Sequence, residues 1–279
     1  MLQQQSMIER TRRVCREDAR LVAAMMYGSF AQNEGDEFSD IEFILFFQDD
    51  ELANLDQEEW VGRISPVGLY FVNEYGHGTA IFENLVRGEF HFDGASDIET
   101  AVGESMRDTD WLPSLEDTLI LDRTGDLTRR LRRIVGPPPE RDTPEQVRFL
   151  CNCFVNWYIF GSNLFARGEL ARSLDLLRMV RDRLLQMVRV LERSTLHWFN
   201  SSKFLEREIS GPSYARFVAC TARLYGDEIR GAYLATWEWG RELMSALADR
   251  YDAAPPEALL ERLDGRFAGI FDGTGRERP

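Results

Sequence analysis

The sequence predicts an α+β protein in two parts, a small mixed sheet with helices followed by a helical bundle. Short apolar runs separated by turn-forming residues fill the first half of the 279-residue chain. A proline-rich stretch, residues 136–144, interrupts the chain near its middle. Beyond it, apolar residues recur at spacings of three and four, which is typical of helices. Consecutive prolines lack backbone donors and stiffen the chain, so the stretch is expected to be a linker.

The first half is expected to begin with a helix over residues 3–17. The turn-like residues 73–78 separate two apolar runs and predict a β-hairpin. Strands are predicted at 21–27, 41–47, 67–73, 79–85, 89–92 and 119–122, and further helices near 57–63, 97–105 and 125–134.

The second half is expected to start where Thr143 caps a helix that has Pro144 at its first position. Helices are predicted over 144–167, 170–193, 197–209, 213–225, 227–251 and 256–271. We therefore expect a sheet-containing domain over 1–135, a linker over 136–146, a helical domain over 147–271 and a flexible tail over 272–279.

The chain is strongly acidic, with a net charge of −14 and a pI near 4.8. Such a surface repels nucleic acid and anionic membranes, so neither is an expected partner. No apolar run reaches the length of a membrane span, and the N-terminus lacks the apolar stretch of a signal peptide. We expect a cytoplasmic protein whose four cysteines are reduced.

A Gly-Ser pair and an Asp-x-Glu pattern mark the most informative stretch. Gly28 and Ser29 end the first predicted strand, and Asp40 and Glu42 open the second. Alternation along a strand places Asp40 and Glu42 on one side, where two carboxylates repel unless a cation lies between them. Carboxylate oxygens suit Mg²⁺, and a Gly-Ser bend suits a phosphate. Each feature alone is commonly structural, but the joint pattern predicts a metal–nucleotide site for phosphoryl or nucleotidyl transfer.

A third carboxylate, Glu89, lies in the predicted strand 89–92. Alternation places Glu89 and His91 on one face of this strand and its two phenylalanines on the other. If the strand neighbours 41–47, Glu89 joins Asp40 and Glu42 as a third metal ligand, or accepts a proton from an acceptor hydroxyl. An exposed glutamate on an edge strand is the alternative. His91 is a candidate substrate contact or a hydrogen-bonded structural residue.

Phosphates also require cations from the protein. Lys203, which is the chain's single lysine, and Arg172 are candidates from the helical half, and a solvated helix face is the alternative for each. The histidines do not cluster with cysteines, so the sequence does not predict a zinc site.

At these residues the chain resembles the polymerase-beta-like nucleotidyltransferase superfamily, and within it the B-type lincosamide nucleotidyltransferases. The superfamily pattern is Gly-Ser, then Asp-x-Asp/Glu, then a third acidic strand residue. The resemblance covers about residues 1–270. The matching segments are Met25–Phe30, Glu34–Asp36, Ser39–Phe43, Asn73–Gly76, Arg87–Phe92, Ala171–Leu174, Lys203–Ser210 and Thr221–Leu224.

The resemblance implies an antibiotic-resistance enzyme that acts as a homodimer, with a catalytic nucleotidyltransferase domain over 1–135 and a helical substrate-binding domain over 147–271. It implies Asp40 and Glu42 as Mg²⁺ ligands, Glu89 as general base, and Gly28 and Ser29 as the triphosphate-binding turn. The implied reaction moves a nucleoside monophosphate from ATP, or a similar nucleotide, to a hydroxyl of lincomycin or clindamycin, and releases pyrophosphate.

Two other functions are consistent with these residues. An aminoglycoside is an alternative acceptor, because an acidic protein attracts a polycation even more strongly than it attracts a lincosamide amine. A nucleotide-binding regulatory or antitoxin module is the non-enzymatic alternative, which the complete acidic trio disfavours.

Overall fold

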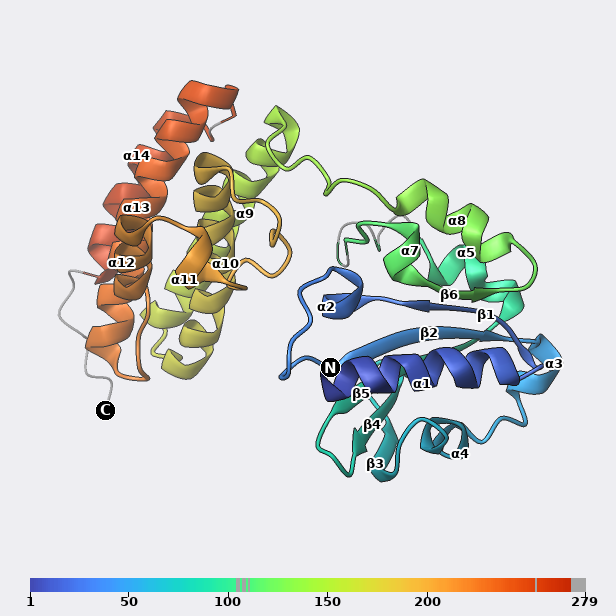
Figure 1. Cartoon of the computed structure of the whole chain (residues 1–279). Coiled ribbons are helices and arrows are strands. Elements are labelled where there is room, and N and C mark those ends of the chain that lie inside the picture. Colours follow the sequence, from blue (N-terminus) through green and yellow to red (C-terminus); the bar gives the residue numbers. More distant parts are fainter. Residues whose placement is uncertain (104–105, 107–108, 110, 254, 272–279) are drawn as a thin grey trace. The chain divides into compact units, whose positions relative to one another are not determined.

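The computed structural model describes residues 1–103, 106, 109, 111–253 and 255–271. The chain forms two compact units, Met1–Pro139 and Glu140–Pro279. A six-stranded mixed sheet with helices makes up the first unit, and helices make up the described part of the second (Figure 1). The α+β prediction is therefore confirmed. The division between the units falls inside the stretch 136–146, and the predicted tail 272–279 lies outside the described residues.

The elements of the first unit follow the predicted order closely. Its strands are β1 (Leu21–Met26), β2 (Ile41–Phe47), β3 (Val67–Val72), β4 (Gly78–Phe82), β5 (Arg87–Gly94) and β6 (Leu119–Asp122). Its helices are α1 (Gln3–Glu17), α2 (Gly28–Ala31), α3 (Asp49–Leu52), α4 (Gln57–Gly62), α5 (Ile98–Ala101), α7 (Leu115–Thr118) and α8 (Asp126–Ile134), with a 3₁₀ turn at Ala95–Asp97. The one-turn helices α2, α3 and α7 are too short to give a periodic signal in the sequence.

The strands lie in the order β3-β4-β5-β2-β1-β6. All neighbouring pairs are antiparallel except β2 and β5, which run parallel. The hairpin predicted around residues 73–78 joins β3 to β4, and the amide of Gly76 donates to the carbonyl of Asn73 at its turn. The parallel pair matters for the site, because the N-terminal ends of β2 and β5 lie side by side.

Strands β1 and β2 form the centre of the core. Nearly every residue in both is buried, which indicates that both faces of the sheet are covered there. Figure 1 shows α1 on one side of these strands and α7 and α8 on the other. Ile41 and Phe43 are fully buried, as alternation predicts, whereas Glu42 between them is only partly buried. The carboxylate of Glu42 therefore points away from the core into which Ile41 and Phe43 pack.

The second unit contains three long helices, α9 (Pro144–Ala166), α10 (Leu170–Glu192) and α13 (Gly226–Tyr251), which share one apolar core. The predicted cap is present, since Thr143 Oγ1 accepts from the amide of Gln146 at 3.3 Å. The remaining helices are α11 (Leu205–Glu208), α12 (Gly211–Ala219) and α14 (Glu257–Phe271). No helix within the described residues is both long enough and apolar enough to cross a membrane.

The helix predicted over 197–209 is wrong for most of its length. Residues 193–204 form an irregular loop, and only α11 is helical. The cause is Arg189 of α10. Its fully buried guanidinium donates hydrogen bonds of 2.6–2.9 Å to the backbone carbonyls of Ser194, Ser201 and Lys203. Burying a guanidinium is costly unless its donors are satisfied, so these tertiary hydrogen bonds outweigh local helix propensity.

Candidate active site

The Gly28–Ser29 bend lies directly against Glu42. Gly28 has φ +71°, a left-handed conformation that favours glycine, and it begins the one-turn helix α2. A Cβ placed on Gly28 would lie 1.6 Å from Glu42 Oε2. Glycine is therefore required at this position for two separate reasons, its backbone conformation and the carboxylate that occupies the space of a side chain.

Asp40 follows a turn that is held in place from two directions. Asp36 Oδ1 accepts from the amide of Phe38 and the hydroxyl of Ser39 at 2.9 and 3.0 Å, which closes the turn. Gln4 of α1 donates to the backbone carbonyls of Glu37 and Ser39. Asp40 thus lies directly before β2, at the end of a loop whose conformation these hydrogen bonds hold.

Glu89 lies beside Glu42, because the two residues are register partners in the parallel pair β2–β5. The sequence predicted a three-carboxylate site only if the strand of Glu89 lies next to 41–47. The structure shows that these two strands are neighbours. Arg87 joins the group: its Nη1 lies 2.6 Å from Asp40 Oδ2, and its Nη2 lies 2.5 Å from Glu89 Oε2. A single guanidinium thus bridges two of the three predicted site carboxylates.

A second set of contacts holds the other oxygen of Glu89. The hydroxyl of Tyr27 lies 2.9 Å from Glu89 Oε1 and 2.9 Å from His91 Nε2. The His91 ring stacks on His77 with centroids 3.5 Å apart and an interplanar angle of 8°. His91 thus points to the same side of the sheet as Glu89, as alternation predicts, and it contacts Tyr27 and His77 rather than standing alone.

These surroundings set the protonation of Glu89 and His91. Burial alone would raise the pKa of Glu89, but the hydrogen bonds from Arg87 and Tyr27 outweigh burial and lower the pKa below its ordinary value. Burial, and then the neighbouring His77, lower the pKa of His91 to about 4. At neutral pH the site therefore presents an ionised carboxylate next to a neutral imidazole.

The donor set suits a divalent cation in its chemistry. Asp40, Glu42 and Glu89 supply hard oxygen atoms, and the Arg87 guanidinium shows that a positive group fits between Asp40 and Glu89. Within the described residues, however, no three His, Cys, Asp or Glu side chains are gathered closely enough to hold a metal ion. A cation shared by Asp40 and Glu89 would take the place that the guanidinium holds.

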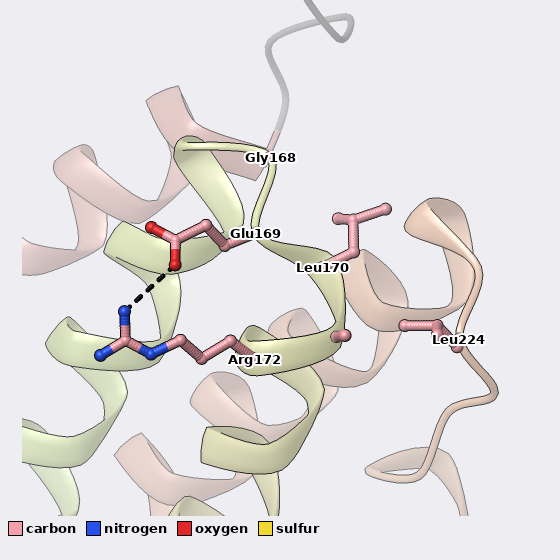
Figure 2. Close-up of a pocket in the computed structure, with 6 residues that line it drawn as sticks. Gly168, Glu169, Leu170, Arg172 and Leu224 are labelled. Atoms are coloured by element: carbon pink, nitrogen blue, oxygen red, sulfur yellow. Dashed lines mark hydrogen bonds and ion pairs between the residues drawn. The ribbon is translucent and has the colours of Figure 1, made fainter.

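Arg172 belongs to the second unit and lies in the first turn of α10. Its Nη1 is 3.1 Å from Glu169 Oε2, and its guanidinium lies over the ring of Phe160 at 5.7 Å. Figure 2 shows Arg172 and Glu169 paired at a shallow pocket, which Leu170 and Leu224 also line. The side chain is 58% exposed, so solutes can reach it.

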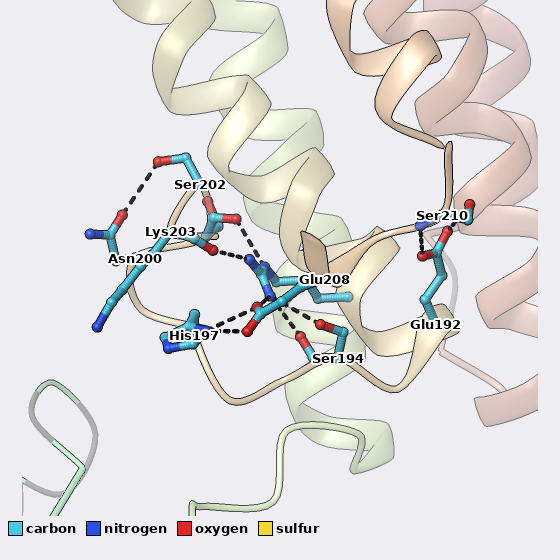
Figure 3. Close-up of polar contacts among 10 residues, drawn as sticks. Glu192, Ser194, His197, Asn200, Ser202, Lys203, Glu208 and Ser210 are labelled. Atoms are coloured by element: carbon cyan, nitrogen blue, oxygen red, sulfur yellow. Dashed lines mark hydrogen bonds and ion pairs between the residues drawn. The ribbon is translucent and has the colours of Figure 1, made fainter. Parts of the chain in front are cut away.

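Lys203 lies in the loop 193–204 of the same unit. Its carbonyl accepts from Arg189 Nη2 at 2.6 Å, and its ammonium lies 5.3 Å from the centre of the Phe204 ring. Arg189 Nη1 also pairs with Glu208 Oε2 at 2.6 Å, and His197 Nδ1 lies 2.8 Å from Glu208 Oε1 (Figure 3). Lys203 therefore lies in a loop whose conformation is held by hydrogen bonds and ion pairs among Arg189, Glu208 and His197.

The sequence made Arg87 a local candidate for phosphate binding, but it did not predict that Arg87 contacts Asp40 and Glu89 or that Tyr27 contacts Glu89. Arg87 carried a signal, because it precedes Glu89 by two and therefore shares its strand face. Tyr27 carried none, since its contact with Glu89 joins residues 62 positions apart. The stacking of His77 on His91 depends on the β4–β5 register, which the sequence does not reveal.

Comparison with known proteins links the second unit to one family. Residues 143–265 match the family model described as the C-terminal domain of lincosamide nucleotidyltransferase-like proteins. This match supports the prediction that the chain is a nucleotidyltransferase enzyme. The comparison with curated proteins gives no match.

Two solved structures align with most of the chain. One is an aminoglycoside 6-adenyltransferase from Bacillus subtilis, with 16% identity, coverage of 97% of this chain and 99% of that chain, and a TM-score of 0.45. The other is a nucleotidyltransferase-like protein from Exiguobacterium sibiricum, with 14% identity, coverage of 87% and 77%, and a TM-score of 0.38.

Proposed function

We propose that this protein transfers a nucleoside monophosphate from a Mg²⁺-bound nucleoside triphosphate, such as ATP, to a hydroxyl of a lincosamide antibiotic and thereby inactivates it. The observation that carries the proposal is the pairing of Glu42 with Glu89 across β2 and β5, next to Asp40 and the Gly28 bend. The family match of residues 143–265 supports the same chemistry.

Each residue of the first unit has a role in this proposal. Glu89 removes the proton of the acceptor hydroxyl, and the oxygen attacks the α-phosphorus in line with the departing pyrophosphate. Asp40 and Glu42, together with Glu89, would hold Mg²⁺, which when bound offsets the negative charge of the phosphates. Gly28 and Ser29 receive the triphosphate, and His91 lies on the acceptor side. The protein mainly orients the two substrates.

Arg87 has a role that depends on what is bound. It neutralises Asp40 and Glu89 when no other cation is there. With Mg²⁺ held by those carboxylates, the Arg87 guanidinium would be available to the negative charge of the nucleotide. Lys203 and Arg172 are the further phosphate-binding cations that we propose from the second unit, and we propose that the enzyme acts as a homodimer.

An acceptor panel tests the proposal. Purified protein is incubated with Mg²⁺, each of four nucleoside triphosphates, and lincomycin, clindamycin or a set of aminoglycosides, and mass spectrometry detects the added nucleotidyl group. A modified lincosamide is the expected product. A modified aminoglycoside would move the acceptor to the class that the net charge of −14 also favours. Nucleotide binding with no modified acceptor would favour a regulatory module instead.

A further inference from the structure

The hydroxyl of Tyr27 is placed between two groups of the proposed site. Tyr27 follows β1 directly and is 7% exposed. Its Oη lies 2.9 Å from both Glu89 Oε1 and His91 Nε2. A buried tyrosine hydroxyl requires hydrogen-bond partners, and these two come from a strand more than sixty residues further along the chain.

The direction of these hydrogen bonds follows from the number of protons. An ionised carboxylate accepts only, so Tyr27 donates its single proton to Glu89 Oε1. The Tyr27 oxygen then accepts from His91, which requires the proton of the neutral imidazole to be on Nε2. The result is a directed chain from His91 through Tyr27 to Glu89.

The two oxygens of Glu89 therefore have different surroundings. Oε1 is held by Tyr27, whereas Oε2 lies against Arg87 on the side of Asp40. We propose that Tyr27 is a positioning residue that fixes Glu89 through Oε1, so that Oε2 is the atom presented to the acceptor hydroxyl. The inference rests on the proposed function, because it assigns a partner to the base of that reaction.

Tyr27 is itself held rigidly, which a positioning residue requires. Its amide donates to the carbonyl of Glu42 at 3.2 Å, which joins it to β2. Its ring meets the His91 ring edge to face, with centroids 5.4 Å apart at 75°. His91 in turn is clamped by the parallel stack with His77. The Tyr27 hydroxyl thus has little freedom to leave Glu89.

Steady-state kinetics of Tyr27→Phe test the inference, because phenylalanine keeps the packed ring and removes only the hydroxyl. We expect kcat to fall about tenfold or more, with the KM of nucleotide and acceptor within about twofold of wild type. The matched control is Tyr70→Phe, which removes a hydroxyl bonded to Gln57 at 2.7 Å and should leave kcat unchanged.

A double variant tests whether Tyr27 acts through Glu89. In a Glu89→Gln background, Tyr27→Phe should lower the residual rate by less than about twofold, because the group that it positions is already disabled. Wild-type turnover in Tyr27→Phe would overturn the inference. So would a full, independent loss in the double variant.

A crystal structure of Tyr27→Phe gives a readout that needs no turnover. We expect the Glu89 carboxylate to leave its wild-type rotamer or to occupy two, while the backbone of β5 stays in place. An unchanged, single Glu89 rotamer would overturn the inference. Failure of the proposed function has a separate signature, a wild-type protein that modifies none of the acceptors in the panel.

Discussion

Glu89 combines two features that suit a base in a crowded acidic site. It is ionised, because hydrogen bonds from Arg87 and Tyr27 outweigh the effect of burial on its pKa. It is also oriented, because each of its oxygens has its own partner. A lowered pKa makes a carboxylate a weaker base, so its orientation toward the hydroxyl matters more than its basicity.

Replacing the proposed base, Glu89, should separate nucleotide binding from chemistry. We expect Glu89→Gln to lower turnover about 100-fold or more, since the amide cannot accept the hydroxyl proton, and to leave nucleotide binding within about threefold. Single-turnover kinetics and calorimetry with a non-hydrolysable nucleotide measure the two quantities. Near-normal turnover would refute the assignment of the base.

Gly28 is constrained both by its own backbone and by Glu42. We expect Gly28→Ala to abolish activity, because the added Cβ meets Glu42 Oε2 and the φ of +71° strains any L-residue. Gly125→Ala is the matched control, since Gly125 has φ +85° and a Cβ added there would have no neighbouring atom within 4 Å.

The two variants should differ in activity more than in stability. Both bear the left-handed backbone cost, about 1–2 kcal/mol of unfolding free energy, but only Gly28→Ala moves a site carboxylate. Urea denaturation and turnover are measured on both. Equal activity of the two variants would show that the contact with Glu42 is irrelevant.

At the scale of elements, Asp18 connects α1, β1 and α4. It is 6% exposed and accepts from Arg20, from Arg63 and from the indole of Trp60. The hydrogen bond from Arg20, against the effect of burial, lowers the pKa of Asp18 to about 2 from 3.8. One carboxylate therefore joins three segments near the start of β1, at the other end of that strand from Tyr27.

This pKa predicts an acid-dependent loss of stability. A folded-state pKa below the ordinary value stabilises the protein above about pH 4, and that contribution is lost as pH falls toward 2. The amount is about 2 kcal/mol. In Asp18→Asn, urea denaturation should show lower stability at pH 7 and a flatter change between pH 4 and pH 2. A pH dependence equal to that of wild type would contradict the role of Asp18.

The loop 193–204 shows how one buried side chain decides the conformation of an element. Arg189 donates hydrogen bonds to backbone carbonyls of this loop, which therefore point toward its buried guanidinium. The ion pair with Glu208 compensates the buried positive charge. The periodicity of the apolar residues favoured a helix here, but periodicity records only which residues are apolar. It gives no information on the hydrogen bonds that Arg189 of α10 makes with the backbone of this loop.

At the scale of the whole molecule, the net charge of −14 favours cationic acceptors. Lincosamides and aminoglycosides both carry basic amines, so the field of the protein attracts either class. We expect kcat/KM for a cationic acceptor to fall about threefold or more between about 0.02 and 0.5 M salt, as the Debye length shortens.

The control for this prediction is an analogue of the same acceptor in which an uncharged group replaces the basic amine. Its kcat/KM should change by less than about 1.5-fold over the same range, because the long-range field no longer acts on it. Equal salt dependence of the two acceptors would show that the field of the protein plays no part in their capture.

The sequence by itself determined the α+β class, most of the strands, and the faces on which Asp40, Glu42 and Glu89 lie. Those properties follow from alternation and periodicity, which are local. The tertiary structure alone decided that β2 and β5 run parallel and side by side, that Arg87 bridges Asp40 and Glu89, and that Tyr27 reaches Glu89. The contacts of Arg87 with Asp40 and of Tyr27 with Glu89 join residues 47 and 62 positions apart, where chain topology and buried hydrogen bonds, rather than local preference, select the partner.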